Sequence, residues 1–399
     1  MTGLILTPGY ECENASTAHY SVYAAPEGNE TQSQEDTIRL FTAPCVQGAL
    51  FLQHHMMKKD VASGQMLPRP QTEIAQYIQS ICKVNEERAK HGCDPLECAF
   101  DCEPAPVQSR RYHNNPPEWP QEPRQQAEKL YQLVVSGEFE HFLEAIDDKG
   151  YYPMCPSNQT LGQIAQQDLP RAERIAQAIG TITGRVMGRL GINMLYAPVC
   201  DLNASAFVER CYGDDPDLVV PLATAWAAGA LSQKGVSRIC LKHAPGHGVS
   251  INQDKEGHQD THNTQCISTE SLEQIDRHMR VFTSVAERLL DQGLPHDAIR
   301  VMTNHITYQA IDSSSPISTS KEGIAYIQDR LPVGIKCIAD CINMAGFAAD
   351  SESFFHNLDI TRDLHTGGVI ATTHFVKKAS REDLIAHIEQ KEPSSSPTV

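Results

Sequence analysis

The chain has 399 residues, of which 40% are hydrophobic and 21% are charged, and its formal net charge at pH 7 is -17. This composition is typical of a globular protein with a large core and excludes a chain that is disordered throughout. The acidic balance argues against nucleic acid or an anionic membrane as a partner, because both bind basic surfaces.

Eight short apolar segments are distributed along the chain. They are GLILTP (3–8), GALFLQ (48–53), LECAFD (96–101), INMLYAPVCD (192–201), RICLKH (238–243), IRVMTNH (299–305), IKCIAD (335–340) and GVIATTH (368–374). Their nearly continuous hydrophobicity is typical of strands that are buried on both faces, as in parallel sheets.

Stretches with helical spacing of apolar residues separate these segments. The spacing predicts helices over 72–91, 124–146, 161–190, 218–234 and 271–290, and two polar or proline-rich segments, 27–36 and 103–123, are expected to be loops. The alternation predicts an α/β fold, and eight strands indicate a single (β/α)8 barrel of the TIM type. We expect this barrel to cover residues 1–391 and residues 392–399, which contain Pro and Ser, to be a disordered tail.

The 13 cysteines are scattered, and no Cys-x-x-Cys pair occurs among them. Cys98, Cys200, Cys240 and Cys337 lie within apolar segments and are expected to be small buried side chains. The first apolar run is too short for a signal peptide, and no run approaches the roughly 18–20 residues of a membrane span. These features predict a cytoplasmic protein with reduced thiols and no structural zinc site. The oligomeric state is left open.

Polar residues close most of the apolar segments. The set consists of Asp101, Asp201, Lys242–His243, Asn304–His305, Asp340 and Thr373–His374. A single Asp after a strand is more often a helix cap or a turn residue. Six such positions at once favour an active site, because barrel enzymes build it at the carboxyl ends of the strands and burying many polar groups for stability alone is costly.

The segment LKHAPGHGVSINQDKEGHQDTH (241–262) contains four of the 17 histidines. Pro245 and Gly246 exclude a helical metal motif for His243 and His247. A metal site built from His247, His258 and His262 is conceivable, but its spacing matches no known motif.

Asp260 and His262 stand two residues apart at the end of this segment. A carboxylate beside an imidazole can orient the ring and raise its basicity, as in a general acid/base, although the pattern alone is a weak signal. The glycines of the segment make it deformable, so that it could close over a substrate.

The same segment resembles a loop of the bacterial β-N-acetylglucosaminidases of glycoside hydrolase family three, the cytosolic enzymes of cell-wall recycling. LKHAPGHG followed by DTH is similar to their Lys-His-Phe-Pro-Gly-His-Gly and Asp-Ser-His. The similarity continues in order along the chain, through FDCEPAPVQSRR, INMLYAPVCDLN, VERCYGDDP, VMTNHITYQAID and IADCINMAGFA.

The resemblance implies a role for each matching residue in a retaining β-N-acetylhexosaminidase that releases N-acetylglucosamine from muropeptide-type sugars without a cofactor. It places Asp340 at the nucleophile, His262 at the acid/base and Asp260 at its partner carboxylate. It implies sugar-binding positions at Asp101, Arg110, Arg210, Lys242 and His243. Retaining glycosidases usually pair two carboxylates, so a histidine donor is a variation on that chemistry.

The chain departs from the family pattern at three places. The loop between Gly248 and Asp260 is longer, which makes His258 a rival of His262 for the acid/base role. Cys341 replaces the second Asp after the nucleophile, and Pro104 and Ala105 replace two glycines. A β-glucosidase, a glycoside phosphorylase and a non-catalytic sugar-binding homologue therefore remain alternatives.

Overall fold

The computed structural model describes residues 4–6, 46–51, 57–59, 66–68, 71–82, 84–90, 95–102, 114–202, 208–248, 250–252, 255–258, 261, 264–342, 344–348, 351–365 and 367–371, together with His387 and Gln390. All eight segments expected to be strands overlap one, although β2 begins before its segment and β7 ends after its segment. They are β1 (Leu4–Leu6), β2 (Val46–Phe51), β5 (Glu97–Phe100), β6 (Met194–Leu195), β7 (Arg238–Ala244), β11 (Ile299–Thr303), β13 (Lys336–Ala339) and β14 (Gly368–Ala371).

These eight strands form one parallel sheet in the order β1-β14-β13-β11-β7-β6-β5-β2. Strand β1 pairs with β14 on one side and with β2 on the other, so the sheet curves back on itself. The prediction of an α/β fold on a parallel sheet is confirmed. Helices are described in the connections from β2 to β14, whereas the connection between β1 and β2 and the chain after β14 lie largely outside the described residues.

The inner face of the curved sheet has a small apolar cluster of its own. Its members are Ala99, Met194, Tyr196, Cys240, Met302, Ile338, Cys341, Met344 and Ile370. A larger cluster fills the space between the outer face and the helices. Successive side chains of a strand point to opposite faces, so every second residue of β5, β7, β11 and β13 faces inward.

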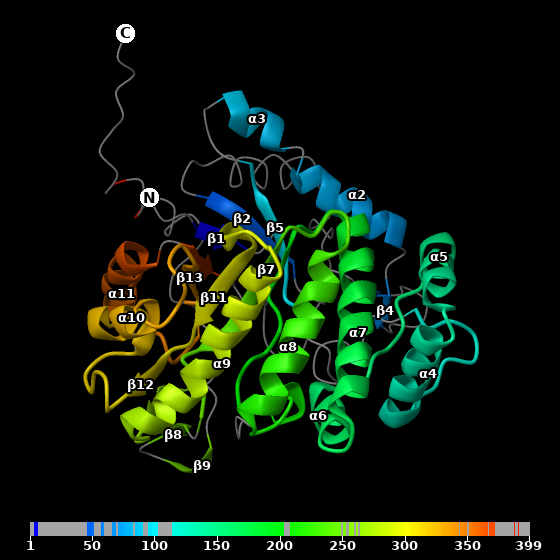
Figure 1. Ribbon diagram of the computed structural model, residues 1–399. Coiled ribbons are helices and arrows are strands. Elements are labelled where there is room, and N and C mark those ends of the chain that lie inside the picture. The colour runs from blue at the N-terminus through cyan, green and yellow to red at the C-terminus, as the bar shows by residue number, and fades with distance from the viewer. Residues whose placement is uncertain are drawn as a thin grey trace.

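Helices that follow β6, β7 and β13 contact strands of the sheet, whereas the first two helices after β5 pack against a longer helix. The described part of the chain contains ten helices in all. They are α2 (Gln71–Cys82), α3 (Val84–Lys90), α4 (Pro123–Val135), α5 (Phe139–Lys149), α6 (Asn158–Ala165), α7 (Leu169–Leu190), α8 (Pro216–Leu231), α9 (Leu272–Asp291), α10 (Lys321–Gln328) and α11 (Ser351–Leu364). Figure 1 shows α7, α8 and α9 side by side.

Two of the predicted helices are each interrupted. The expected helix 124–146 divides into α4 and α5 near Gly137, whose φ of 78° suits glycine. The expected helix 161–190 divides into α6 and α7, because Asp168 caps a new helix by accepting a hydrogen bond from the Arg171 backbone N–H. The helix expected from residue 271 begins at Leu272, where Ser271 and Gln274 form a capping box.

Helices α7 and α8 approach each other closely because small residues lie at their contact. A Cβ added at Gly180 would lie 2.0 Å from the carbonyl oxygen of Trp226, and one at Gly229 would lie 2.2 Å from that of Gln177. Neither position has room for a side chain. This contact fixes α8, the helix that connects β6 to β7, and Asp201 and His247 follow these two strands along the chain.

A second, four-stranded sheet lies beyond the carboxyl end of β7, in the order β12-β10-β8-β9. Its strands are β8 (Ser250–Asn252), β9 (Lys255–His258), β10 (Cys266–Ser268) and β12 (Ile306–Tyr308), and a separate hairpin joins β3 (Met57–Lys59) and β4 (Met66–Pro68). The sequence predicted a deformable loop where β8 and β9 form an antiparallel pair. These residues therefore form strands where a loop was expected, and the deformability of the segment stays a prediction.

The cysteines agree with the sequence analysis at three of four positions. Cys200, Cys240 and Cys337 are buried free thiols. Cys98 is buried as expected, but it is disulfide-bonded, so the prediction of a reduced thiol is wrong at this position. In the described part of the chain, no helix is both long and apolar enough to cross a membrane.

Candidate active site

Polar side chains continue the inner face of the sheet at its carboxyl end. Asp101 stands two residues after Ala99, Lys242 two after Cys240 and Asp340 two after Ile338. By the alternation of strand side chains, these three polar residues face the same side as the inner apolar cluster. Strands far apart in the sequence therefore direct polar groups to one end of the sheet, as the sequence predicted.

Lys242 and Asp101 form an ion pair between the ends of β7 and β5. The Lys242 ammonium donates a hydrogen bond to Asp101 Oδ1, and the side chains are 3% and 20% exposed respectively. Removing either partner would take from the other, largely buried charge a close partner of opposite sign, which is destabilising. The pair thus holds a preorganised positive and negative group at the mouth of the sheet.

Asp340 follows the last residue of β13 and is 8% exposed. Its backbone N–H donates to the Thr303 carbonyl at 3.1 Å, and its Oδ1 accepts from the Cys341 N–H at 2.7 Å. His305 lies within hydrogen-bonding distance of the Cys341 carbonyl, with Nε2 3.0 Å from that oxygen. These contacts fix the position of the Asp340 carboxylate while leaving a small part of the side chain accessible.

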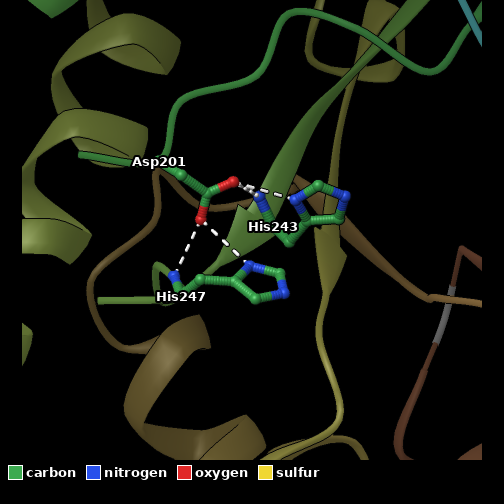
Figure 2. A group of neighbouring side chains, drawn as sticks. All are labelled: Asp201, His243 and His247. Carbon is green, nitrogen blue, oxygen red and sulfur yellow. Dashed lines mark hydrogen bonds and ion pairs between the residues drawn. The ribbon is translucent and has the colours of Figure 1, made fainter. Parts of the chain in front are cut away.

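Asp201 joins His243, near the end of β7, to His247 in the turn that follows (Figure 2). Its Oδ2 accepts from the backbone N–H of His243 at 3.1 Å and lies 2.8 Å from Nδ1 of that ring. Its Oδ1 accepts from the backbone N–H of His247 at 2.8 Å and lies 3.2 Å from the second ring's Nδ1. The rings meet edge to face with centroids 4.8 Å apart. The donor atoms of the three side chains lie within 4.8 Å of one another, a spacing that could also hold a metal ion.

The ionisation of this cluster follows from burial and mutual attraction. Burial lowers the pKa of His243 below its usual value, and the neighbouring carboxylates of Asp201 and Asp340 oppose that shift. Burial alone would raise the pKa of Asp201, but His247 and His243 together lower it well below its usual value. The cluster is therefore a carboxylate in contact with two imidazoles. The Asp340 carboxylate also acts to raise the pKa of His243.

Residues of β11 and β12 hold the turn from the other side. The Asn304 side-chain amide donates to the His243 carbonyl at 3.2 Å, and the Tyr308 hydroxyl donates to the Gly246 carbonyl at 2.6 Å. Gly246 has a φ of 122°, and a Cβ there would lie 2.6 Å from that of His278. Only glycine fits this position without displacing His278.

Thr261 connects the far end of the histidine segment to the neighbourhood of Asp340. Its carbonyl accepts from the Gly346 N–H at 2.9 Å, and its hydroxyl lies 3.9 Å from the Met344 sulfur. Thr261 is 2% exposed. The segment Met344–Gly346 begins four residues after Asp340, so the centre of the Asp-Thr-His triplet packs beside the strand end that holds Asp340.

The family description "Glycosyl hydrolase family 3 N terminal domain" matches residues 125–348, which is more than half of the chain. This range contains the turn after β7, the Asp201 cluster and Asp340. The chain belongs to glycosyl hydrolase family 3. The family resemblance stated from the sequence is thereby confirmed.

Relatives in this family agree with that assignment. A "Beta-hexosaminidase" of Chromobacterium violaceum is 29% identical over 220 residues, which are 52% of this chain and 57% of that protein. The chain thus spans little more than half the length of this relative.

Two solved structures show the same fold. A family 3 β-N-acetylglucosaminidase from Paenibacillus sp. has a TM-score of 0.62 at 20% identity, covering 90% of this chain and 56% of that one. NagZ from Neisseria gonorrhoeae, in complex with N-trifluoroacetyl-D-glucosamine, has a TM-score of 0.59 at 18% identity, covering 91% and 87% respectively.

The structure brings together some of the site residues that were predicted from the sequence. Lys242 and Asp101 are in contact, and His243 and Asp340 interact electrostatically. Arg210 ends the short 3-10 helix Val208–Arg210 and is 8% exposed, and its carbonyl accepts from the Asn158 amide at 2.7 Å.

Other predicted residues are not placed. Asp260, His262, Arg110 and the strand-end pair Thr373–His374 lie outside the described residues, and of His258 only its backbone position at the end of β9 is described. The roles expected for these residues stay predictions.

One functional grouping was missed from the sequence. Asp201 was recognised as a strand-end residue, and His247 was considered only as a metal ligand with His258 and His262. The structure instead pairs His247 with Asp201 and His243. The signal that could have found the group is the position of Asp201 at the end of the strand next to β7, where a carboxylate would face the histidine turn.

Proposed function

We propose that this chain is a retaining β-N-acetylhexosaminidase that hydrolyses terminal β-N-acetylglucosamine from muropeptide-type sugars. The observation that supports it most is the gathering of Asp340, His243 and the Lys242–Asp101 pair at one end of a family 3 sheet. The relatives named β-hexosaminidase favour an N-acetylated sugar over glucose. The complete scaffold is proposed to be a single (β/α)8 barrel over residues 1–391, followed by a tail at 392–399.

In this proposal Asp340 is the nucleophile. The buried, hydrogen-bonded position of its carboxylate favours attack at one fixed point. An oxygen of Asp340 would form a bond to the anomeric carbon while the glycosidic bond breaks. Water would then hydrolyse this glycosyl-enzyme, so two inversions give net retention.

His262 is proposed to be the acid/base, with Asp260 as its partner carboxylate. The packing of Thr261 against Met344 and Gly346 supports a place for the triplet beside Asp340. An imidazole is suited to donate a proton to the leaving oxygen and later to accept one from water, because its ordinary pKa is near neutral. His258 belongs to the same segment and remains the rival for this role.

Asp101, Lys242, His243, Arg210 and Arg110 are proposed to bind the sugar. The Lys242–Asp101 pair offers both donors and acceptors for hydroxyl groups in a place with little water. This reaction needs neither metal nor another cofactor, because a nucleophile and an acid/base suffice. The predicted cytoplasmic location meets one contrary observation, since Cys98 is disulfide-bonded and disulfides are rare in cytosolic proteins.

The experiment is turnover of a chromogenic N-acetyl-β-glucosaminide compared with the matching glucoside, with and without inorganic phosphate. We expect hydrolysis of the N-acetylated substrate, no dependence on phosphate, and a β-anomer as the first product by proton NMR. Preference for the glucoside would identify a β-glucosidase, and a sugar phosphate product would identify a phosphorylase. Binding without turnover of either substrate would indicate a non-catalytic sugar-binding protein.

A further inference from the structure

The carboxylate of Asp201 is fully buried and lies between two imidazoles that it contacts through four hydrogen bonds. Each oxygen contacts the backbone N–H and the ring Nδ1 of one histidine, as Figure 2 shows. We propose that Asp201 is a positioning residue that fixes the orientation and the tautomer of His243 and His247. It holds Nδ1–H of each ring toward itself, so that Nε2 of each ring points away from the carboxylate.

The first argument is the count of donors and acceptors. An ionised carboxylate is an acceptor only and offers about four lone-pair positions. Two backbone N–H groups, which cannot act as acceptors, already point at its oxygens. When each ring also donates from Nδ1, the four donors match the four acceptor positions. The opposite tautomer would set a lone pair of Nδ1 against a carboxylate oxygen at 2.8 Å or 3.2 Å, which is repulsive.

The second argument is that Asp201 also closes the turn that holds both rings. By binding the backbone N–H of His243 and of His247, one side chain fixes both ends of a turn of five residues. Asn304 and Tyr308 hold the carbonyls of the same turn from β11 and β12. The imidazoles therefore have little freedom to rotate, which is the property needed of groups that orient a substrate.

The third argument connects the cluster to the chemistry and rests on the proposed function. His243 lies within electrostatic reach of Asp340, the proposed nucleophile. A ring whose tautomer is fixed from behind presents the same Nε2 atom to the sugar in every turnover. Comparable carboxylate–imidazole pairs in other hydrolases lose about 10⁴-fold in kcat when the carboxylate becomes an amide, because the tautomer is wrong.

A metal ion is the competing explanation, since the same donor atoms lie within 4.8 Å of one another. Metal binding to the Nδ1 atoms would require both rings to be deprotonated there. The observed geometry is already complete as a set of hydrogen bonds, with backbone donors on both oxygens. The hydrogen-bonded arrangement is therefore favoured, and the metal is an outcome of the test.

The primary experiment is ¹⁵N NMR of the full chain labelled at histidine, with His243→Gln and His247→Gln used to assign the two rings. We expect a proton on Nδ1 of both rings. This readout does not depend on activity or on any variant of Asp201. Two rings with unprotonated Nδ1 would overturn the proposal. Stoichiometric perturbation of both Nδ1 signals by Zn²⁺ added to chelator-treated protein, at micromolar concentration, would replace it with a metal site.

The second experiment is Asp201→Asn. The amide keeps the shape but turns one acceptor into a donor that faces a ring and a backbone N–H, so at least one ring should change tautomer. We expect kcat/KM for the N-acetyl-β-glucosaminide to fall about 10²- to 10⁴-fold, mostly in kcat. Asp276→Asn is the matched control. Asp276 lies on helix α9, outside the site, and accepts hydrogen bonds from Tyr326 and Arg330.

The two experiments separate this proposal from the proposed function. Retention of both tautomers in Asp201→Asn, with kcat/KM within about threefold of the wild type, would show that Asp201 does not position the rings. If the wild type does not turn over the substrate at all, the proposed function fails, and the NMR tautomers still decide the role of Asp201. If Asp201→Asn does not fold, the wild-type spectrum alone gives the decision.

Discussion

Two groups of buried polar side chains lie on the inner face of the same sheet, with the inner apolar cluster between them. At the amino end of the strands, Arg300 forms an ion pair with Glu97 at 2.9 Å and donates to the Gly367 carbonyl at 2.8 Å. At the carboxyl end, Lys242 pairs with Asp101, and Asp340 follows β13. The two groups are similar in burial and in their origin from the same strands.

They differ in what their chemistry allows. The pair at the amino end joins Arg300, which keeps its proton in proteins, to the Glu97 carboxylate. Hydrogen bonds join the two side chains directly. The group at the carboxyl end also contains imidazoles and the Asp340 side chain, which is 8% exposed. In barrel enzymes, polar residues at the amino end of the strands serve stability and those at the carboxyl end serve catalysis. By this rule we expect the buried charges at the amino end to serve the fold and those at the carboxyl end to serve the proposed reaction.

Of the variants that distinguish the two ends of the sheet, Asp340→Asn should have the largest effect on activity. The amide keeps the shape and the acceptor for the Cys341 N–H but lacks the charge of the attacking oxygen. We expect kcat/KM to fall by roughly 10⁴-fold or more on every substrate. The free energy of unfolding, measured in urea, should change by less than about 1 kcal/mol, because sites are not optimised for stability.

Activity above about one hundredth of the wild type in Asp340→Asn would remove this residue from the nucleophile role. Asp312→Asn is a suitable control, since Asp312 lies in a turn away from the strand ends, where it accepts hydrogen bonds from Ser314 and interacts with Ser315 and Ser320.

The next effect concerns proton donation and depends on the leaving group. His262→Ala should lower turnover of a natural disaccharide by about 10²- to 10⁴-fold, the usual value of general acid catalysis. An activated aryl glycoside needs little protonation, so its cleavage step should be affected much less. Steady-state kinetics on both substrates measures the difference.

His258→Ala is the matched control for this prediction. If His258→Ala shows the leaving-group dependence and His262→Ala does not, the roles of the two histidines are exchanged. If neither variant shows it, the proton donor lies elsewhere.

The third prediction tests the pair at the amino end. Arg300→Met should destabilise the protein by about 3–5 kcal/mol, because it leaves the buried Glu97 carboxylate without its main partner. The kcat of the folded fraction should stay near that of the wild type. Urea unfolding followed by circular dichroism measures the first effect, and turnover per folded molecule measures the second.

The double variant Glu97→Gln with Arg300→Met removes both charges and should recover part of the lost stability. A large loss of kcat in Arg300→Met, with stability unchanged, would contradict the division between the two ends.

The sequence predicted the sheet well because buried parallel strands have a simple signature. Each of the eight apolar segments overlaps one strand of the curved sheet, and Asp101, Lys242 and Asp340 lie at its carboxyl end as expected. Breaks within helices were missed at Gly137 and Asp168, where a local turn or cap overrides the apolar period.

Other features depend on contacts between distant segments and have no local signal. The strands β8, β9, β10 and β12 have only three or four residues each, and β10 pairs with β12 across 40 positions, as in Ser268 with Tyr308. The contact of Asp201 with His243 and His247 spans more than 40 residues. Such contacts follow from the order of strands in the sheet, which spacing along the chain does not specify.

The smallest expected effect concerns a third buried imidazole, that of His365, which can be compared with His243. His365 is fully buried, with Nδ1 2.9 Å from the Thr361 carbonyl and Nε2 2.8 Å from the Thr303 hydroxyl. Burial lowers its pKa from 6.5 to about 4. His243 is also buried, but Asp201 and Asp340 oppose the shift of its pKa. Comparing the two rings therefore distinguishes the effect of burial on the pKa without a neighbouring carboxylate from its effect beside two carboxylates.

The pKa of His365 in the folded protein is lower than in the unfolded chain, so the unfolded chain takes up the proton first as the pH falls. The stability linked to this ring is complete above about pH 6.5 and is lost as the pH falls toward 4. Between pH 7.5 and pH 5 the loss should be about 2 kcal/mol. In His365→Gln this part of the pH dependence should disappear, whatever the absolute stability of the variant. Urea unfolding at the two pH values measures it, with His141→Gln as the exposed control. An identical pH dependence in His365→Gln and the wild type would mean that His365 is not the group whose protonation destabilises the fold in this pH range.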